Sequence, residues 1–219
     1  KAPHRMVRGF SAFRGILVPG AEFSGQAELS GQWGRGAGIL CRMAYVIRPV
    51  KAQEWQRLRE LRLAALADPV ARVAFNETLE EAAGQPDELW QSRAARSEEG
   101  VAPMTFIGEA ADGSWGGMVV VLVETDEEVP QTHLVGVYVR PGHRGTGLAR
   151  ELFRAAIGWS WELTEPAVER VRLWVHEENG RAEAFYRALG FVETGLTSAD
   201  PKDPAALERE LVLKRGDRV

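Results

Sequence analysis

The stretch Val135-Gly-Val-Tyr-Val-Arg-Pro-Gly-His-Arg-Gly-Thr-Gly-Leu-Ala149 joins an alternating apolar strand, a glycine-rich turn and the start of a helix. Gly145 and Gly147 expose backbone N–H groups at the beginning of that helix. Unpaired donors and the positive end of the helix both attract an anion there. Arg144 adds a full positive charge beside the turn. This stretch therefore predicts a binding site for a phosphate group.

Two common phosphate-binding patterns do not fit the turn. A nucleotide P-loop follows Gly-x-x-x-x-Gly-Lys-Ser/Thr. Gly142 and Gly147 have that spacing, but Leu148-Ala149 stand where the lysine and the hydroxyl residue belong. A dinucleotide fingerprint needs a third glycine after Gly145 and Gly147, where this chain has Arg150. An acyl-CoA-binding turn and a helix start without a ligand remain open.

A second motif lies one predicted helix and one predicted strand further on, at Asn179-Gly-Arg-Ala-Glu-Ala-Phe-Tyr-Arg-Ala-Leu-Gly-Phe191. It resembles the second signature of the GNAT superfamily of acyl-CoA-dependent N-acetyltransferases, Asn-x-x-Ala-x-x-Phe-Tyr-x-x-x-Gly-Phe, and fills every defined position. The glycine turn resembles the superfamily's acyl-CoA turn, Arg/Gln-x-x-Gly-x-Gly/Ala. With Gly145 and Gly147 taken as its two glycines, the Arg/Gln position falls on Gly142, a departure from the pattern. The resemblance covers residues 44–214 and is strongest over 132–193.

Apolar periodicity and turn residues predict an α/β fold around these motifs. The predicted strands are 44–48, 105–110, 115–124, 133–139, 171–175, 191–193 and 207–214, and the predicted helices are 52–67, 88–97, 148–161 and 181–189. Residues 70–86 are ambiguous. Hairpins in the middle and a crossover helix after the fourth strand indicate a mixed sheet. The resemblance implies the GNAT fold, a mixed and mostly antiparallel sheet of six to seven strands flanked by about four helices, with splayed fourth and fifth strands.

The resemblance also implies acetyl-CoA as cosubstrate, with its pantetheine arm inserted between the splayed strands like an extra strand. Asn179 would bond the cofactor or the acceptor near the thioester. The other implied cofactor-binding residues belong to the fourth strand and the glycine turn: Val137, Tyr138 and Val139 beside pantetheine, and Arg144, Gly145, Thr146, Gly147, Leu148 and Ala149 around the pyrophosphate.

Acyl transfer to an amine needs a proton for the leaving thiolate and a base for the amine. The resemblance assigns the proton to Tyr186. Helical spacing puts Ala182, Phe185 and Leu189 on one face, which is expected to pack on the sheet, and Tyr186 lies one step off that face, where its hydroxyl is expected to face a cleft. His133 is a candidate base, because it begins the fourth strand and histidine titrates near neutral pH. Other strand-end groups, or a water chain, could serve instead; those groups are Glu124, His176 and Glu177.

Composition excludes several classes of protein. The net charge is −4, and no element carries a cluster of lysine and arginine, so no nucleic-acid partner is expected. No apolar run is long enough to span a bilayer, so no membrane partner is expected. The single cysteine, Cys41, fits a reducing compartment, which indicates a cytoplasmic protein. The four histidines are scattered, so no metal site is expected.

Residues 1–42 differ from the rest, with eight glycines and six lysines or arginines against two acids. They show no apolar period, which predicts a poorly structured, vector-derived or upstream-translated extension before Met43, with a transit peptide as the alternative. Residues 43–219 are then a single GNAT domain. Its acceptor would be a primary amine of a small molecule or peptide. Alternatives are a non-catalytic acyl-CoA sensor and a protein lysine or N-terminal acetyltransferase; a homodimer is possible. Acceptor specificity would come from 52–97 and a loop at 194–206.

Overall fold

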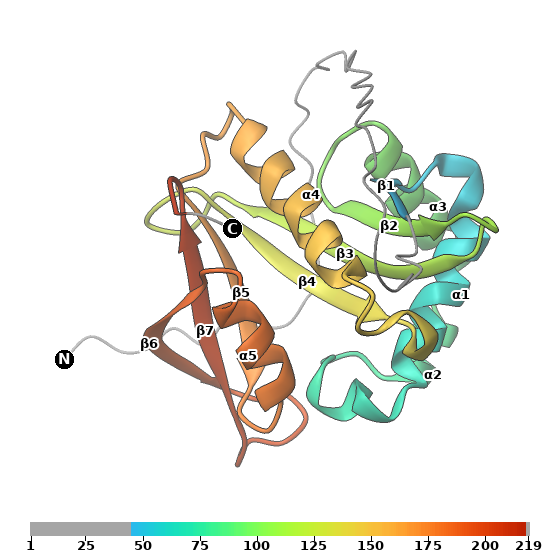
Figure 1. The fold of residues 1–219 in the computed structure, drawn as a ribbon. Coiled ribbons are helices and arrows are strands. Elements are labelled where there is room, and N and C mark those ends of the chain that lie inside the picture. Colours follow the sequence, from blue (N-terminus) through green and yellow to red (C-terminus); the bar gives the residue numbers. More distant parts are fainter. Residues whose placement is uncertain (1–44, 218–219) are drawn as a thin grey trace, which may run out of the picture.

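The computed structural model describes residues 45–217, which form a seven-stranded sheet with helices on both faces (Figure 1). The strand order is β1-β2-β3-β4-β5-β7-β6, and every neighbouring pair is antiparallel except β4 and β5. This confirms the mixed, mostly antiparallel sheet. The strands are β1 (Tyr45–Pro49), β2 (Met104–Ala110), β3 (Trp115–Glu124), β4 (Gln131–Val139), β5 (Arg170–His176), β6 (Val192–Ala199) and β7 (Leu207–Lys214).

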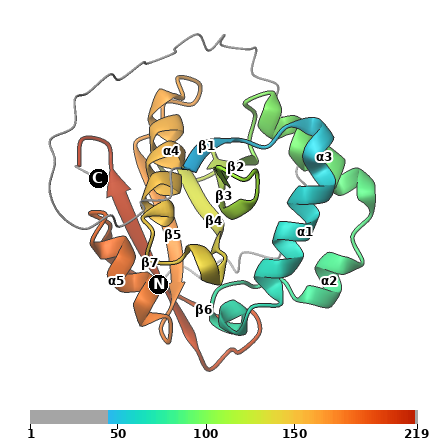
Figure 2. The same ribbon diagram turned by 45° about the vertical axis from the view of Figure 1, so that its right-hand side comes forward.

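The helices divide between the two faces of the sheet (Figure 2). One side carries α1 (Trp55–Leu66), α2 (Leu79–Ala83) and α3 (Asp87–Glu98), and the other carries α4 (Leu148–Glu162) and α5 (Gly180–Arg187). Short 3-10 turns are η1 (Ala52–Glu54), η2 (Pro69–Val73) and η3 (Pro141–His143). The ambiguous segment 70–86 thus becomes η2 and α2. The predictions for 1–42 and Cys41 lie outside the described residues.

The sheet separates two hydrophobic cores. The α4 side buries residues such as Phe153, Val171 and Leu211, while the α1 side buries Leu61 and Ile107. Successive side chains of a strand point to opposite faces, so the apolar runs of the central strands feed both cores. The helical spacing of apolar residues in α1 and α4 supplies the opposing surfaces. Sequence periodicity therefore accounts for the layers.

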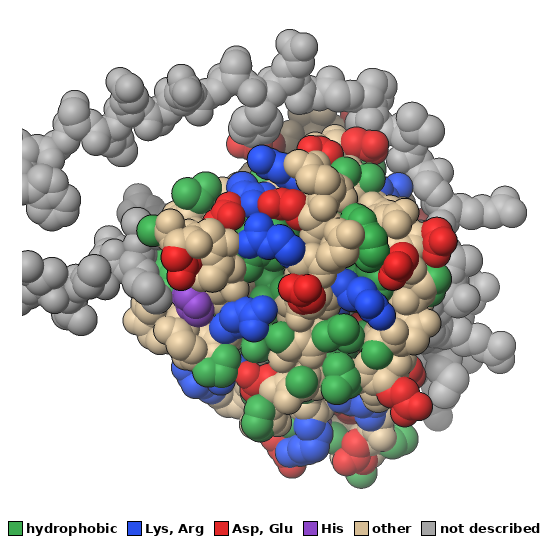
Figure 3. Space-filling model, turned by 90° about the vertical axis from the view of Figure 1, so that its right-hand side faces the viewer, with side chains coloured by type: hydrophobic (Ala, Val, Ile, Leu, Met, Phe, Trp, Pro, Cys, Tyr) green, Lys and Arg blue, Asp and Glu red, His purple; other side chains and the backbone are tan. Residues whose placement is uncertain are grey.

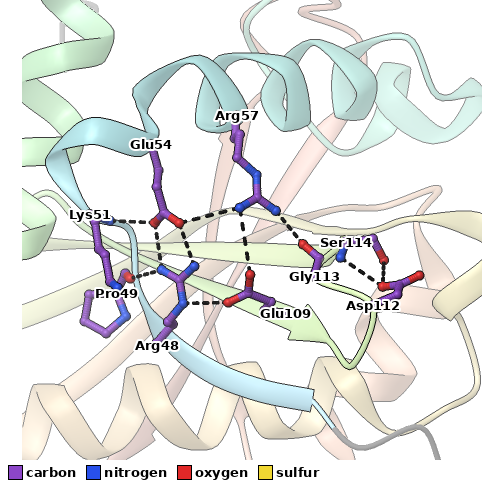
Figure 4. Close-up of polar contacts among 9 residues, drawn as sticks. All are labelled: Arg48, Pro49, Lys51, Glu54, Arg57, Glu109, Asp112, Gly113 and Ser114. Atoms are coloured by element: carbon purple, nitrogen blue, oxygen red, sulfur yellow. Dashed lines mark hydrogen bonds and ion pairs between the residues drawn. The ribbon is translucent and has the colours of Figure 1, made fainter.

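A network of ion pairs fastens the start of α1 to β1 and β2 (Figure 4). The Arg48 guanidinium of β1 lies 2.7 Å from the Glu54 carboxylate and 2.8 Å from that of Glu109 on β2. Hydrogen bonding to Arg48 lowers the pKa of the Glu54 carboxyl below its usual range. Arg57 of α1 stacks on the Trp115 ring, 4.3 Å from its centroid. These contacts fix the start of α1 over the sheet. Elsewhere on this side of the molecule, positive and negative side chains are interspersed (Figure 3).

The end of the chain departs from the sequence prediction at β6. A short strand at 191–193 and a loop at 194–206 were expected, but β6 continues to Ala199 and pairs with β7. Its register shifts between Glu193 and Thr197, and all eight of its residues are exposed. A strand with no buried face shows no apolar alternation, so its sequence lacks the signal that marks the other strands.

Candidate active site

The two parallel strands of the sheet separate soon after they meet. β4 and β5 pair only at Gln131 with Arg170, Thr132 with Val171 and His133 with Arg172. Beyond His133, the facing backbone edges of both strands have no ladder partner within residues 45–217. Unpaired N–H and C=O groups on a strand edge can bind an extended ligand as an added strand. The splay that the resemblance implied is therefore present.

A β-bulge lies where β4 leaves β5. Tyr138 pairs with Met118 of β3, but Val135 pairs with Val120, so β4 has one residue too many between these pairs. Gly136 has a φ of +61°, which glycine adopts without strain. A bulge bends its strand and re-aims the local backbone groups. The bulge therefore changes the direction in which main-chain groups of β4 point. It does so just beyond His133, where the pairing of β4 with β5 ends.

The glycine turn follows β4 and leads into α4. Gly145 and Gly147 have φ values of +80° and +95°, and an added Cβ at either would meet no atom within 4 Å. Gly147 is the N-cap of α4, so the helix begins at Leu148. With the helix start fixed, the acyl-CoA pattern can be aligned with the turn in a different way from the one used above. The pattern fits two residues further on, with Arg144 as the arginine, Gly147 as the glycine and Ala149 as the Gly/Ala position, and the departure at Gly142 disappears.

The Arg144 side chain turns back toward the protein. Its Nη2 lies 2.5 Å from the Oδ2 of Asp68, and its Nε donates to the carbonyl oxygen of Val139 at 3.0 Å. The Asp68 side chain is only 4% exposed, so this ion pair is largely shielded from water. The predicted pyrophosphate arginine therefore already has an anionic partner. Of the turn's backbone donors, the Arg144 N–H already donates to the Pro141 carbonyl at 3.2 Å and the Leu148 N–H lies 3.5 Å from the Thr146 Oγ1. The N–H groups of Gly145, Thr146 and Gly147 have no acceptor within residues 45–217 and are the open donors of the turn. Sequence reasoning missed Asp68, whose Asp-Pro context indicated only a helix end.

Tyr186 lies deeper than its helical position indicated. It was expected to face a cleft, beside a buried face of Ala182, Phe185 and Leu189. Instead Tyr186 is 8% exposed, whereas Ala182 and Phe185 are only partly buried. Its ring packs 5.5 Å from that of Phe153 on α4, between centroids. Burial raises the pKa of the Tyr186 hydroxyl to about 12. The phenol is therefore protonated at neutral pH and can act as a proton donor.

Asn179 is held at both ends of its amide. Its side-chain oxygen accepts from the Ala182 N–H at 3.3 Å, which caps α5, and its Nδ2 donates to the Val73 carbonyl at 3.3 Å. Asn side chains commonly satisfy the first free N–H groups of a helix in this way. Asn179 thus links the start of α5 to η2, and its second Nδ2 hydrogen has no partner within residues 45–217.

His133 belongs to a charged cluster at the closed end of the splay. Its Nδ1 lies 3.1 Å from the Oε1 of Glu124, and Arg172 donates to the same oxygen at 2.9 Å. Arg172 also lies 3.4 Å from Glu210 of β7, whose side chain is 1% exposed. Burial acts to raise the pKa of the Glu124 carboxyl, but His133 and Arg172 outweigh it and lower the pKa to about 2. The carboxylate thus orients the imidazole.

We expect Glu124→Gln to weaken the fold in a pH-dependent way. A carboxyl whose folded pKa is depressed contributes stability above its unfolded pKa near 4.5, and that stability is lost as pH falls toward 2. The variant should therefore lose roughly 2–3 kcal/mol of unfolding free energy at pH 7. Urea unfolding at pH 7, 5 and 3 measures this loss. The difference in unfolding free energy between wild type and variant should be smaller at pH 3 than at pH 7. The same difference in unfolding free energy at all three pH values would contradict a stabilising role of the Glu124 charge.

The two other strand-end candidates for the base, His176 and Glu177, make contacts within the protein. The His176 Nδ1 accepts from the Glu178 N–H at 3.1 Å, and its Nε2 lies 3.7 Å from Asp200. Glu177 accepts from the Leu207 N–H at 2.9 Å. The structure also places Glu208 of β7 near this group. Burial, together with Asp200, raises the pKa of its carboxyl. Sequence analysis did not single out Glu208, because alternation along a strand indicates which side chains share a face and does not indicate what they contact.

Solved structures resemble this arrangement closely enough to define the fold. The spermidine/spermine N-acetyltransferase SpeG of Vibrio cholerae aligns with a TM-score of 0.57 at 19% identity, over 78% of this chain and 95% of that chain. The PaiA N-acetyltransferase of Thermoplasma acidophilum, in complex with coenzyme A, aligns with a TM-score of 0.58 at 18% identity, over 77% and 98%. The splayed sheet, bulge and glycine turn therefore define a GNAT fold.

Sequence comparison gives the family. Residues 57–191 match the model of the acetyltransferase (GNAT) family, and the chain belongs to that family. Streptothricin acetyltransferase of Streptomyces lavendulae is 33% identical over 97 residues, which are 43% of this chain and 48% of that protein. The chain thus matches about half the length of this curated relative.

Two further properties concern the described region alone. Between residues 45 and 217, no helix combines the length and the apolar character that a bilayer crossing requires. In the same region, histidine, cysteine and carboxylate side chains nowhere gather in threes as potential metal ligands.

Proposed function

We propose that this protein transfers an acetyl group from acetyl-CoA to a primary amine of a small molecule or peptide. The observation that carries the proposal is the gap between β4 and β5, whose edges have no ladder partner within residues 45–217. It begins after His133 and runs past the bulge at Gly136 to the glycine turn before α4. An extended amide chain that ends in a diphosphate matches both features. Pantetheine amides would pair with the edge of β4, and the diphosphate would accept from the turn.

The roles of individual cofactor-binding residues follow from this placement. Backbone groups from Val137 to Val139 would pair with pantetheine, since the Val137 and Val139 side chains pack toward the α4-side core and Tyr138 toward the α1-side core. Asn179 would contact the ligand through its remaining hydrogen. The diphosphate would bind the turn from Arg144 through Gly145, Thr146, Gly147 and Leu148 to Ala149.

The reaction is a direct transfer. The amine nitrogen attacks the thioester carbonyl, the carbon–sulfur bond breaks, and the thiolate takes the proton of Tyr186. His133 would accept the proton that the amine loses, with Glu124 orienting its ring through Nδ1. With a pKa of about 12, the Tyr186 phenol carries its proton at physiological pH, as a tyrosine of ordinary pKa also would, so the proton that the thiolate requires is available.

Two other functions compete with this one. A non-catalytic acyl-CoA sensor would bind the same cofactor and would not need Tyr186. A protein acetyltransferase would take lysine side chains or N-termini as its acceptor. A cytoplasmic location fits the single cysteine in all three cases.

Calorimetric titration with acetyl-CoA, CoA and ATP tests the donor. We expect saturable binding of both CoA species and none of ATP, because the turn lacks the lysine and hydroxyl of a nucleotide P-loop. A panel of small amines and peptides, with release of free thiol as the readout, then tests catalysis. Binding without thiol release from any amine would favour the sensor. Absence of CoA binding would contradict the proposal.

A further inference from the structure

The first strand is joined to the glycine turn by side chains about a hundred residues apart in sequence. The Tyr45 hydroxyl lies 2.9 Å from the Nδ1 of His143 and 3.2 Å from the Oγ1 of Thr146. The Thr146 hydroxyl donates to the His143 carbonyl oxygen at 2.7 Å. The Tyr45 and His143 rings also meet edge to face, with centroids 5.7 Å apart. We call these three residues the turn network.

Only one direction of donation satisfies all three hydrogen bonds. A carbonyl oxygen can only accept, so the Thr146 proton is committed to the His143 carbonyl. Thr146 must therefore accept from Tyr45, and Tyr45 must accept from His143. The Nδ1 of His143 consequently carries a proton. The three hydrogen bonds form a closed ring, in which each hydroxyl donates once and accepts once. The Thr146 Oγ1 also lies 3.5 Å from the Leu148 N–H at the start of α4.

The packing of β3 leaves room for this arrangement. A Cβ atom at Gly116 would lie 2.8 Å from the Nδ1 of His143 and 2.8 Å from a methyl carbon of Leu148. Such approaches are closer than real Cβ contacts allow. Glycine at this position thus lets the imidazole and the first residue of α4 lie directly on β3. The turn is held from two strands at once, by Tyr45 of β1 and by the surface of β3.

We propose that Tyr45 and His143 are positioning residues that hold the glycine turn in its diphosphate-binding shape. This inference rests on the proposed function. Neither side chain needs to touch the cofactor. Gly145 and Gly147 make the turn conformationally free in the absence of such contacts, and ordering a loop on binding weakens affinity. The turn network would remove that loss by fixing the turn beforehand.

Tyr45→Phe tests the proposal, because it keeps the ring and removes both hydroxyl contacts. We expect the Kd for CoA to rise about tenfold. With an acceptor from the amine panel, KM for acetyl-CoA should rise by a similar factor while kcat stays near wild type. The kcat/KM for S-acetylpantetheine, which lacks the diphosphate, should not change. Equal losses with both donors, or no loss with either, would overturn the inference.

Two controls separate positioning from general destabilisation. Ser97→Ala removes a fully buried hydroxyl that bonds Arg93 and Thr105, away from the turn, and should lower the melting temperature without changing CoA affinity. His143→Phe should weaken CoA binding as Tyr45→Phe does, and the double variant should lose little more than either single one. Fully additive losses would mean that the two residues act separately and would overturn the shared network.

The failure of the proposed function is distinguishable from the failure of this inference. A wild-type protein that binds no CoA would overturn both. Wild-type CoA affinity that Tyr45→Phe leaves unchanged would overturn this inference alone.

Discussion

Replacing Tyr186 with phenylalanine should lower kcat by about 100-fold and leave the Kd for CoA within about twofold of wild type. The substitution removes one hydroxyl from a ring packed against Phe153, and the ring itself stays. If the hydroxyl protonates the CoA thiolate, the variant must expel an unprotonated leaving group or wait for water. Stopped-flow or steady-state thiol release and calorimetry together give both quantities.

The matched control for this prediction is Phe185→Leu. Phe185 contacts the same Phe153 ring, 5.3 Å between centroids, but carries no proton to donate. It should lower the melting temperature and change kcat far less than Tyr186→Phe does. An unchanged kcat in Tyr186→Phe would remove Tyr186 from the proton path. The pKa of about 12 adds a second check, since no alkaline loss of activity below pH 10 should come from this phenol.

Replacing Gly145 with valine should weaken CoA binding by roughly 100-fold or more. The φ of +80° at this position is strained for a β-branched residue, so the turn must reshape or remain under strain. The added side chain would also stand in the open space outside the turn, where the diphosphate is proposed to lie. Calorimetric titration with CoA measures the loss.

Gly142→Ala is the control in the same connection. Its Cβ would also meet nothing within 4 Å, but its backbone is not in the left-handed region, so alanine fits without strain. It should bind CoA as wild type does. Normal CoA affinity in Gly145→Val would overturn the assignment of the turn to the diphosphate.

Much of the fold could be predicted from local pattern. The strand at 115–124 and the start of α4 at Leu148 were predicted at the residues where the structure has them. Both have strong periodicity and clear turn residues, which act within a few residues of sequence. β6 was underestimated because an exposed strand has no alternating signal. The segment 70–86 was ambiguous because η2 and α2 are too short to show a period.

The site was predicted less completely than the fold. The glycine turn and the helix with Tyr186 were recognised as motifs, but their side-chain partners were not. Asp68 pairs with Arg144 across 76 positions of sequence, and Tyr45 meets His143 across 98. No local pattern encodes such contacts, because they form only when folding brings distant segments of the chain together.

Local features of the chain were enough to predict the class of fold, the order of its elements and the two motifs on which the proposed chemistry rests. Backbone propensity, apolar period and glycine placement are local properties, so they can be read along the chain. Tertiary packing sets how deeply Tyr186 lies, which anion pairs with Arg144 and which strands contact the glycine turn. Burial and pairing depend on what packs from elsewhere in the chain, and so do the pKa shifts that follow from them.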